Sequence, residues 1–144
     1  VLFGLTLDHG SKELARAVME GVAYELRACL DVLAGMKMLP ERIVLMGGGS
    51  KGELWNQIKA NVTGFAVGLP RQTEAASLGA FILAGAGIGL FPDPAATSQS
   101  INPVVRHFEV NRREKEIYDG LYAVYNELYE ATEKLTHRLA QLEG

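Results

Sequence analysis

"VLMGGGSKGELWNQ", residues 44–57, passes from an apolar run through three consecutive glycines into a predicted helix. Glycine loses more conformational freedom on folding than any other residue, so this run indicates either positive φ angles or a ligand that approaches too closely for a side chain. Backbone N–H groups at the start of a helix favour anionic or polar ligand atoms. The segment therefore predicts a ligand-binding turn, and a turn used only for tight packing is the alternative.

The residues around this turn alternate between strand-like and helix-like patterns. The predicted elements, in chain order, are a strand at 1–7, a helix at 11–35, a strand at 42–46, a helix at 54–63, a strand at 65–69, a helix after Glu74, a loop at 85–103 and a helix at 111–142. Apolar positions of the first helix recur every three or four residues and are Leu14, Val18, Val22, Leu26, Cys29 and Leu33. Strands that alternate with helices predict an α/β layered domain. Its sheet has so few strands that we expect it to continue outside this sequence.

Composition excludes several classes of protein. The 144 residues are 48% hydrophobic and 22% charged, which is typical of one globular domain. A net charge of −3 and the lack of a basic face argue against nucleic-acid binding. No apolar run reaches the roughly 18 residues of a membrane span, and we expect no signal peptide. We therefore expect a cytoplasmic protein with one core cysteine, Cys29. Because the chain opens on Val1 in the middle of a predicted strand, we also expect a fragment of a longer protein.

The glycine run fits a known motif only in part. Residues 47–52 satisfy G-x-G-x-x-G between a strand and a helix, as in dinucleotide-binding domains. Such domains also need an acidic residue at the end of the next strand, to bind the ribose hydroxyls. Here that strand ends in Leu69-Pro70-Arg71-Gln72, which contains no acid. A P-loop is excluded because no Gly-Lys-Ser/Thr follows at the required spacing. A dinucleotide-binding domain of an oxidoreductase remains an alternative.

Three ordered segments resemble the FGGY carbohydrate kinases. FGLTLDHGSKELARAVMEGVAYELR (3–27) resembles the second signature of that family. IVLMGGGSKGELWNQIKANVTGFAVGLP (43–70) is similar to its adenosine segment, and TEAASLGAFILAGAGIGLF (73–91) to the helix that follows. The tail FEVNRREKEIYDGLYAVYNELY (108–129) is most similar to that of xylulokinase-type members. Segments in matching order are far more specific than one glycine motif.

The resemblance implies a part of the actin-like, ribonuclease-H-like ATPase fold, with residues 1–144 as the C-terminal nucleotide-binding portion of an ATP-dependent sugar kinase. It places Gly48, Gly49 and Ser50 near the adenosine and α-phosphate of ATP, and Glu53 near the adenine. The sugar site, the catalytic base and the Mg²⁺ ligands would precede residue 1, so we expect no catalytic or metal-ligating residue here and no activity of the chain alone. We expect Gly49→Val to abolish nucleotide binding without unfolding the chain. Trp55 is interpreted as a core anchor, with stacking on adenine as the alternative.

The last predicted helix raises a further alternative. Its apolar positions recur close to a heptad pattern and are Ile117, Leu121, Val124, Leu128, Ala131, Leu135, Leu139 and Leu142. A helical interaction module, or a homodimer formed through this helix, would use such a seam. Four tyrosines widen the apolar face, which favours packing on the domain itself; they are Tyr118, Tyr122, Tyr125 and Tyr129.

Overall fold

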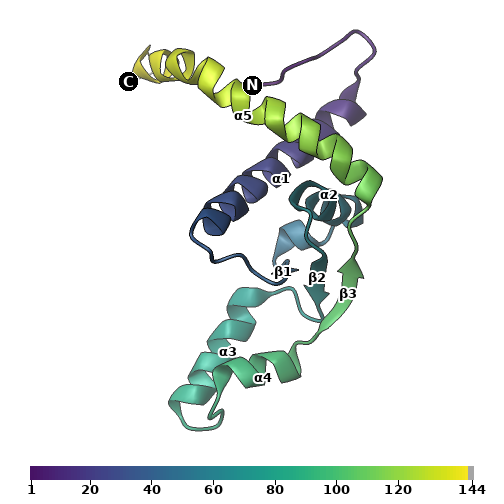
Figure 1. Cartoon of the computed structure of the whole chain (residues 1–144). Coiled ribbons are helices and arrows are strands. Elements are labelled where there is room, and N and C mark those ends of the chain that lie inside the picture. The colour runs from purple at the N-terminus through teal and green to yellow at the C-terminus, as the bar shows by residue number, and fades with distance from the viewer. Residues whose placement is uncertain (143–144) are drawn as a thin grey trace.

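The computed structural model describes residues 1–142 and shows a mixed α/β arrangement (Figure 1). In chain order the elements are α1 (Ser11–Gly35), β1 (Ile43–Val44), the short 3-10 helix η1 (Gly48–Ser50), α2 (Glu53–Thr63), β2 (Val67–Pro70), α3 (Ala75–Gly87), α4 (Pro94–Ile101), β3 (Val104–Phe108) and α5 (Arg112–Leu142). The strands form one sheet in the order β1-β2-β3. β1 runs parallel to β2, and β3 runs antiparallel to it.

One core lies where α1, α2 and α5 meet. Its buried side chains come from all three helices and are Ala23, Tyr24, Ile58, Val62, Tyr118 and Tyr122. The rings of Tyr24 and Tyr118 meet edge to face, with centroids 6.3 Å apart. Arg27 donates hydrogen bonds to the Val62 carbonyl and, at 2.7 Å, to Asp119. Tyr118, Tyr122 and Tyr125 of α5 therefore pack on the domain, as predicted, whereas Tyr129 is 65% exposed. These contacts hold α2 on the side that faces α1 and α5.

A second core lies between α2 and the sheet. Ala60 of α2 packs with side chains of all three strands or their ends; these are Ile43, Leu45, Val67, Leu69 and Phe108. Gly68 of β2 permits a close approach of β3, because a Cβ atom there would lie 2.8 Å from Val104 Cγ1. Since α2 is held on both sides, the turn that leads into it has a rigid support.

The predicted strand at residues 1–7 is wrong. These residues form an exposed, irregular segment in which Gly4 has a φ of 77° and Leu7 is fully exposed. A strand needs a neighbour for its backbone N–H and C=O groups. No strand of residues 1–142 pairs with this segment. An apolar, β-prone sequence is therefore not sufficient for a strand to form here.

The predicted loop at 85–103 is also wrong, because it contains α4. Asp93 caps this helix, and its carboxylate accepts hydrogen bonds from the N–H groups of Ala95 and Ala96. Pro94 occupies the first turn, where its missing N–H costs nothing. The pair Asp93-Pro94 was therefore a helix start signal that the Gly and Pro content of this region obscured. Strand β3, which follows directly, was missed as well.

The expected core position of Cys29 is not confirmed. Cys29 is exposed, and Val18 and Val22 of the same predicted stripe are 62% and 48% exposed. Helix α1 instead turns Ala23 and Tyr24 toward α2 and α5. The helix itself is correctly predicted, whereas its buried face is rotated from the one that the apolar spacing indicates.

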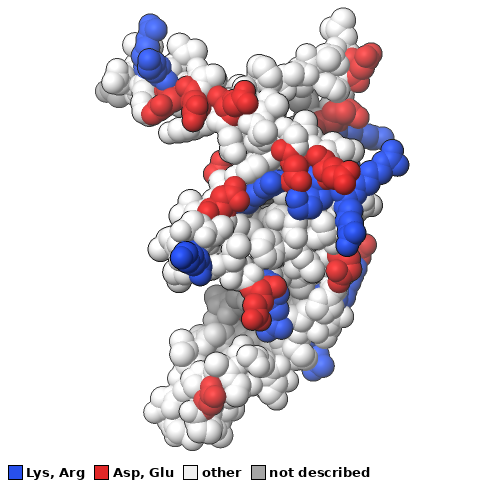
Figure 2. All heavy atoms as spheres, viewed as in Figure 1, with Lys and Arg blue, Asp and Glu red and all other residues white. Residues whose placement is uncertain are grey.

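Charged side chains are unevenly distributed. Figure 2 shows them gathered over α1, α2 and α5, with the end of the molecule around α3 and α4 almost free of them. Residues 75–105 contain only one charged residue, Asp93. Phe81, Leu83 and Ile88 are more than half exposed in this region. No helix among residues 1–142 has both the length and the apolar character needed to cross a membrane.

Candidate nucleotide-binding turn

The glycine run forms a compact turn between β1 and α2. Gly47 has a φ of 75°, a conformation that side chains disfavour. Its N–H donates to the Thr73 carbonyl at 2.7 Å, which ties the turn to the segment before α3. The N–H groups of Ser50 and Lys51 then close η1 by donating to the Gly47 and Gly48 carbonyls. The turn is therefore fixed at both of its ends.

The glycines differ in what lies around them. Gly48 is exposed, and a Cβ atom built on it would meet nothing within 4 Å. A Cβ atom on Gly49 would lie 3.3 Å from Cζ3 of Trp55. Gly48 thus leaves the backbone open to an approaching ligand, whereas Gly49 is needed for close packing on α2. The packing interpretation therefore applies to Gly49, and the ligand-binding interpretation stays a prediction for Gly48.

The structure brings the predicted residues Gly48, Gly49, Ser50 and Glu53 together in this turn and the first turn of α2. Ser50 is buried, and its hydroxyl donates to the Gly47 carbonyl at 2.7 Å. The Ser50 side chain therefore stabilises the turn from inside. Glu53 is exposed and accepts a hydrogen bond from Nη2 of Arg106 at 2.8 Å. The carboxylate of Glu53 is thus oriented by strand β3.

Two polar side chains of α2 donate hydrogen bonds to carbonyl groups of the turn. Asn56 Nδ2 donates to the Ser50 carbonyl at 2.7 Å, and Lys59 Nζ donates to the Gly49 carbonyl at 2.9 Å. Both side chains are buried. Asn56 Oδ1 has no hydrogen-bond partner among residues 1–142. Sequence reasoning missed these two residues, although polar side chains three positions apart on an otherwise apolar helix face were an available signal.

Trp55 joins the turn to α1. Its Nε1–H donates to the Met19 carbonyl at 3.2 Å, and the Lys59 ammonium lies 3.9 Å from the ring centroid. The ring edge is next to Gly49. Because Lys59 occupies a face of the ring and the ring edge packs on the turn, the structure supports the core-anchor interpretation of Trp55.

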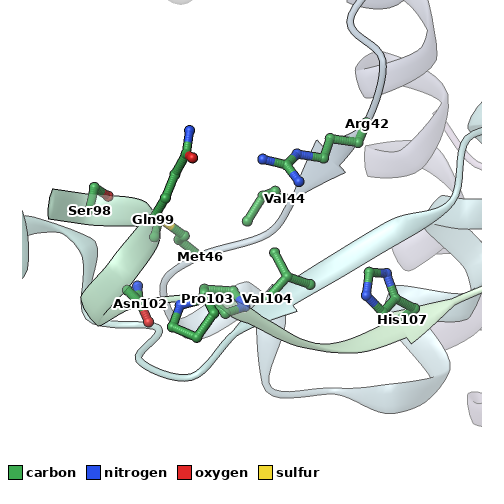
Figure 3. A pocket seen from close by; sticks show the side chains of 10 residues that line it. Arg42, Val44, Met46, Ser98, Gln99, Asn102, Pro103, Val104 and His107 are labelled. Atoms are coloured by element: carbon green, nitrogen blue, oxygen red, sulfur yellow. The ribbon is translucent and has the colours of Figure 1, made fainter. Parts of the chain in front are cut away.

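A separate, open pocket of about 400 Å³ lies beside the turn, where β1, β3 and α4 come together (Figure 3). Its lining includes Arg42, Gln99 and His107, and Met46, which directly precedes the glycines. The amide of Asn102 also lines the pocket, but it makes two hydrogen bonds with the backbone of Gln72. Among residues 1–142, no group of three or more His, Cys, Asp or Glu side chains could hold a metal ion.

Known proteins similar to this chain agree on one family. Residues 1–88 match the C-terminal domain of the FGGY family of carbohydrate kinases. Xylulose kinase of Staphylococcus epidermidis is 32% identical over 135 residues, which cover 92% of this chain and 27% of that protein. Autoinducer-2 kinase of an Enterobacter species is 43% identical over 89 residues, covering 62% of this chain and 17% of that protein.

Solved structures give the same result for the fold. The crystal structure of ligand-bound xylulose kinase from Lactobacillus acidophilus superposes with a TM-score of 0.79 at 28% identity, covering 91% of this chain and 26% of that one. The chain thus spans about a quarter of the length of these xylulose kinases. Its α/β arrangement is that of the C-terminal domain of FGGY kinases, an actin-like ATPase fold. The family match favours a kinase over the dinucleotide-binding alternative for the glycine motif. The chain belongs to the FGGY family of carbohydrate kinases.

Proposed function

We propose that residues 1–144 form the C-terminal, nucleotide-binding part of an ATP-dependent sugar kinase of the cytoplasm. The observation that carries this proposal is the open backbone at Gly48 within a turn that is fixed at both ends. A bare backbone held in place lets a nucleotide come into contact without displacing a side chain. Membership of a kinase family makes ATP the expected ligand.

Each predicted residue then has a distinct part. Gly48 gives the ligand access to the backbone, while Gly49 and Ser50 hold the turn in shape. Glu53, oriented by Arg106, lies at the edge where the adenine would bind. The Mg²⁺ ligands and the catalytic base are proposed to lie in sequence outside this chain, which spans only about a quarter of the length of the xylulose kinases that it resembles. In the whole enzyme the γ-phosphate of ATP would pass to a sugar hydroxyl, a reaction that depends on positioning and charge stabilisation.

The exposed apolar faces support a role within a longer protein. Val18 and Val22 of α1 and Leu83 of α3 each expose about half or more of their surface. Large exposed apolar patches in a globular protein mark sites where another surface binds. We propose that the remainder of the kinase covers these faces. A homodimer formed through the apolar stripe of α5 stays a prediction.

The sugar is the least constrained part of the proposal. We propose a xylulokinase-type substrate, because the similarity to the xylulose kinase of Staphylococcus epidermidis covers 92% of this chain. The higher identity of 43% to an autoinducer-2 kinase, over a shorter range, favours autoinducer-2 as the second candidate substrate. Sugar contacts are expected in the rest of the enzyme, so steady-state assays of the intact kinase with both substrates distinguish the two.

The nucleotide proposal is tested by NMR titration of the chain with ADP and, separately, with NAD. We expect ADP to shift the amide signals of residues 47–53, at the roughly millimolar affinity of an incomplete site. NAD should cause no shift specific to these residues. Tighter binding of NAD than of ADP would contradict the kinase interpretation, and an ADP response centred elsewhere would overturn the assignment of the turn.

The chain alone is expected to show no ATP turnover with D-xylulose. In-line phosphoryl transfer needs a base and metal-bound phosphates, and the resemblance to the FGGY kinases implies that both are supplied by sequence before residue 1. A coupled assay for ADP release measures this. Turnover that follows the purified chain through chromatography would show that catalytic residues lie among those present.

A further inference from the structure

Lys59 is a buried lysine without an acidic partner. Its side chain is only 7% exposed, and no ion pair joins it to any carboxylate of residues 1–142. Lysine is almost never buried unless it is paired, because an unpaired buried charge costs free energy. Burial accordingly lowers the pKa of its ammonium group. The groups next to Lys59 must therefore compensate for the cost of burying its charge.

The ammonium group of Lys59 contacts the glycine turn and the ring that packs on it. Its Nζ donates to the Gly49 carbonyl at 2.9 Å and lies 3.9 Å from the ring centroid of Trp55, which itself packs against Gly49. Asn56, one turn earlier in α2, donates to the following carbonyl of the turn, which is that of Ser50. Two consecutive carbonyl oxygens are therefore turned toward α2. Carbonyl oxygens repel anions, so this arrangement leaves the open side at Gly48 more favourable for an anionic group.

A carbonyl oxygen and an aromatic ring compensate the Lys59 charge only in part. A cation over an aromatic face gains less than the cost of removing an ammonium group from water. The remaining positive charge lies next to the turn and is screened little by solvent because it is buried. An anion bound over the turn would balance it.

We infer that Lys59 is the positioning residue of the nucleotide turn: it holds the Gly49 carbonyl inward and supplies the buried positive charge that favours a phosphate group over Gly48. The inference rests on the proposed nucleotide-binding function and deepens it, since it names the residue of this chain that supplies positive charge for the phosphate groups. Lys59 acts through the Gly49 backbone and through its charge, without direct contact with the reacting atoms.

The test compares ADP with adenosine for the wild-type chain and for Lys59→Met and Lys59→Gln. Methionine keeps the buried aliphatic length, and glutamine keeps an N–H donor without the charge. NMR titration gives both affinities, and the emission of Trp55, the single tryptophan of the chain, reports on the turn without any nucleotide. Lys134→Met, on an exposed position of α5, is the control for loss of one positive charge.

We expect both Lys59 variants to weaken ADP binding about tenfold while adenosine binding changes less than about twofold. Lys134→Met should change neither affinity. Equal losses for ADP and adenosine would reduce Lys59 to a structural residue and overturn the inference, as would unchanged ADP binding. If the wild-type chain binds neither ligand, the proposed function fails instead. In that case unaltered Trp55 emission and Gly49 amide shifts in Lys59→Met would separately overturn the holding role of Lys59.

Discussion

Gly48→Val is expected to remove ADP binding while leaving the fold intact. A Cβ atom at Gly48 meets nothing within 4 Å, so the branched side chain has space in the free protein. That space is where the nucleotide is proposed to lie. A valine there would have to be displaced or would hold the ligand away from the backbone, and loss of close contact over several atoms costs more than 2 kcal/mol, or about 30-fold in affinity. At a starting affinity near millimolar, NMR titration should detect no shift at residues 47–53.

The matched control is Gly120→Val on α5, where a Cβ atom also meets nothing within 4 Å. It makes the same chemical change on an exposed surface away from the turn, and ADP binding should be unchanged. The amide spectrum of each variant in the absence of ligand shows whether the fold is retained. Wild-type affinity for ADP in a folded Gly48→Val chain would exclude Gly48 from the binding surface.

Gly49→Val, which the sequence alone favours for this test, is a poorer choice. A Cβ atom at Gly49 would lie 3.3 Å from Trp55 Cζ3 and 3.9 Å from Lys59 Nζ. A loss of binding would then mix ligand exclusion with movement of the indole ring and of the lysine that supports the turn. The sequence shows that three glycines are adjacent, but only the direction of each Cα–Cβ bond separates the open glycine from the packed one.

Local signals in the sequence predicted the elements that local signals govern. Helix α2 ends at Gly64, which adopts the left-handed conformation with a φ of 76°, as expected of a glycine C-cap. The glycine turn and the long α5 also lie where their patterns place them. In each case the capping or turn residues determine the backbone within a few positions, without help from distant parts of the chain.

The wrong predictions share a different cause. The spacing of apolar residues predicts which face of a helix is buried, but it does not identify the element that packs against this face. Val22 and Cys29 fit the apolar period of α1 and are exposed in this chain, and the apolar segment at 1–7 has no strand beside it. Between residues 75 and 105 a single charged residue leaves almost no polar face to mark a helix period. Lys59 was missed because its partners, Gly49 and Trp55, become neighbours only when the turn folds back on α2.

Ile58→Ala is expected to give the largest loss of stability. Ile58 is 1% exposed and packs in the core shared by α1, α2 and α5. Truncation of a buried isoleucine removes its transfer free energy and leaves a cavity, which together cost about 2–5 kcal/mol. We expect a loss near 3 kcal/mol, since the three helices enclose the site and cannot easily collapse into it. For a chain of this size the midpoint of thermal unfolding should fall by roughly 10 °C.

Ile88→Ala is the matched control, because it makes the same truncation at a position that is 81% exposed. Its effect on the free energy of unfolding should be within about 0.5 kcal/mol of zero. Thermal and urea denaturation, followed by circular dichroism, measure both variants. The rigid support of the turn depends on the core around Ile58, so Ile58→Ala should also weaken ADP binding at temperatures where the chain is still folded. Equal, small effects of the two substitutions would mean that α2 is not held between α1 and α5, and the basis for a preformed turn would be lost.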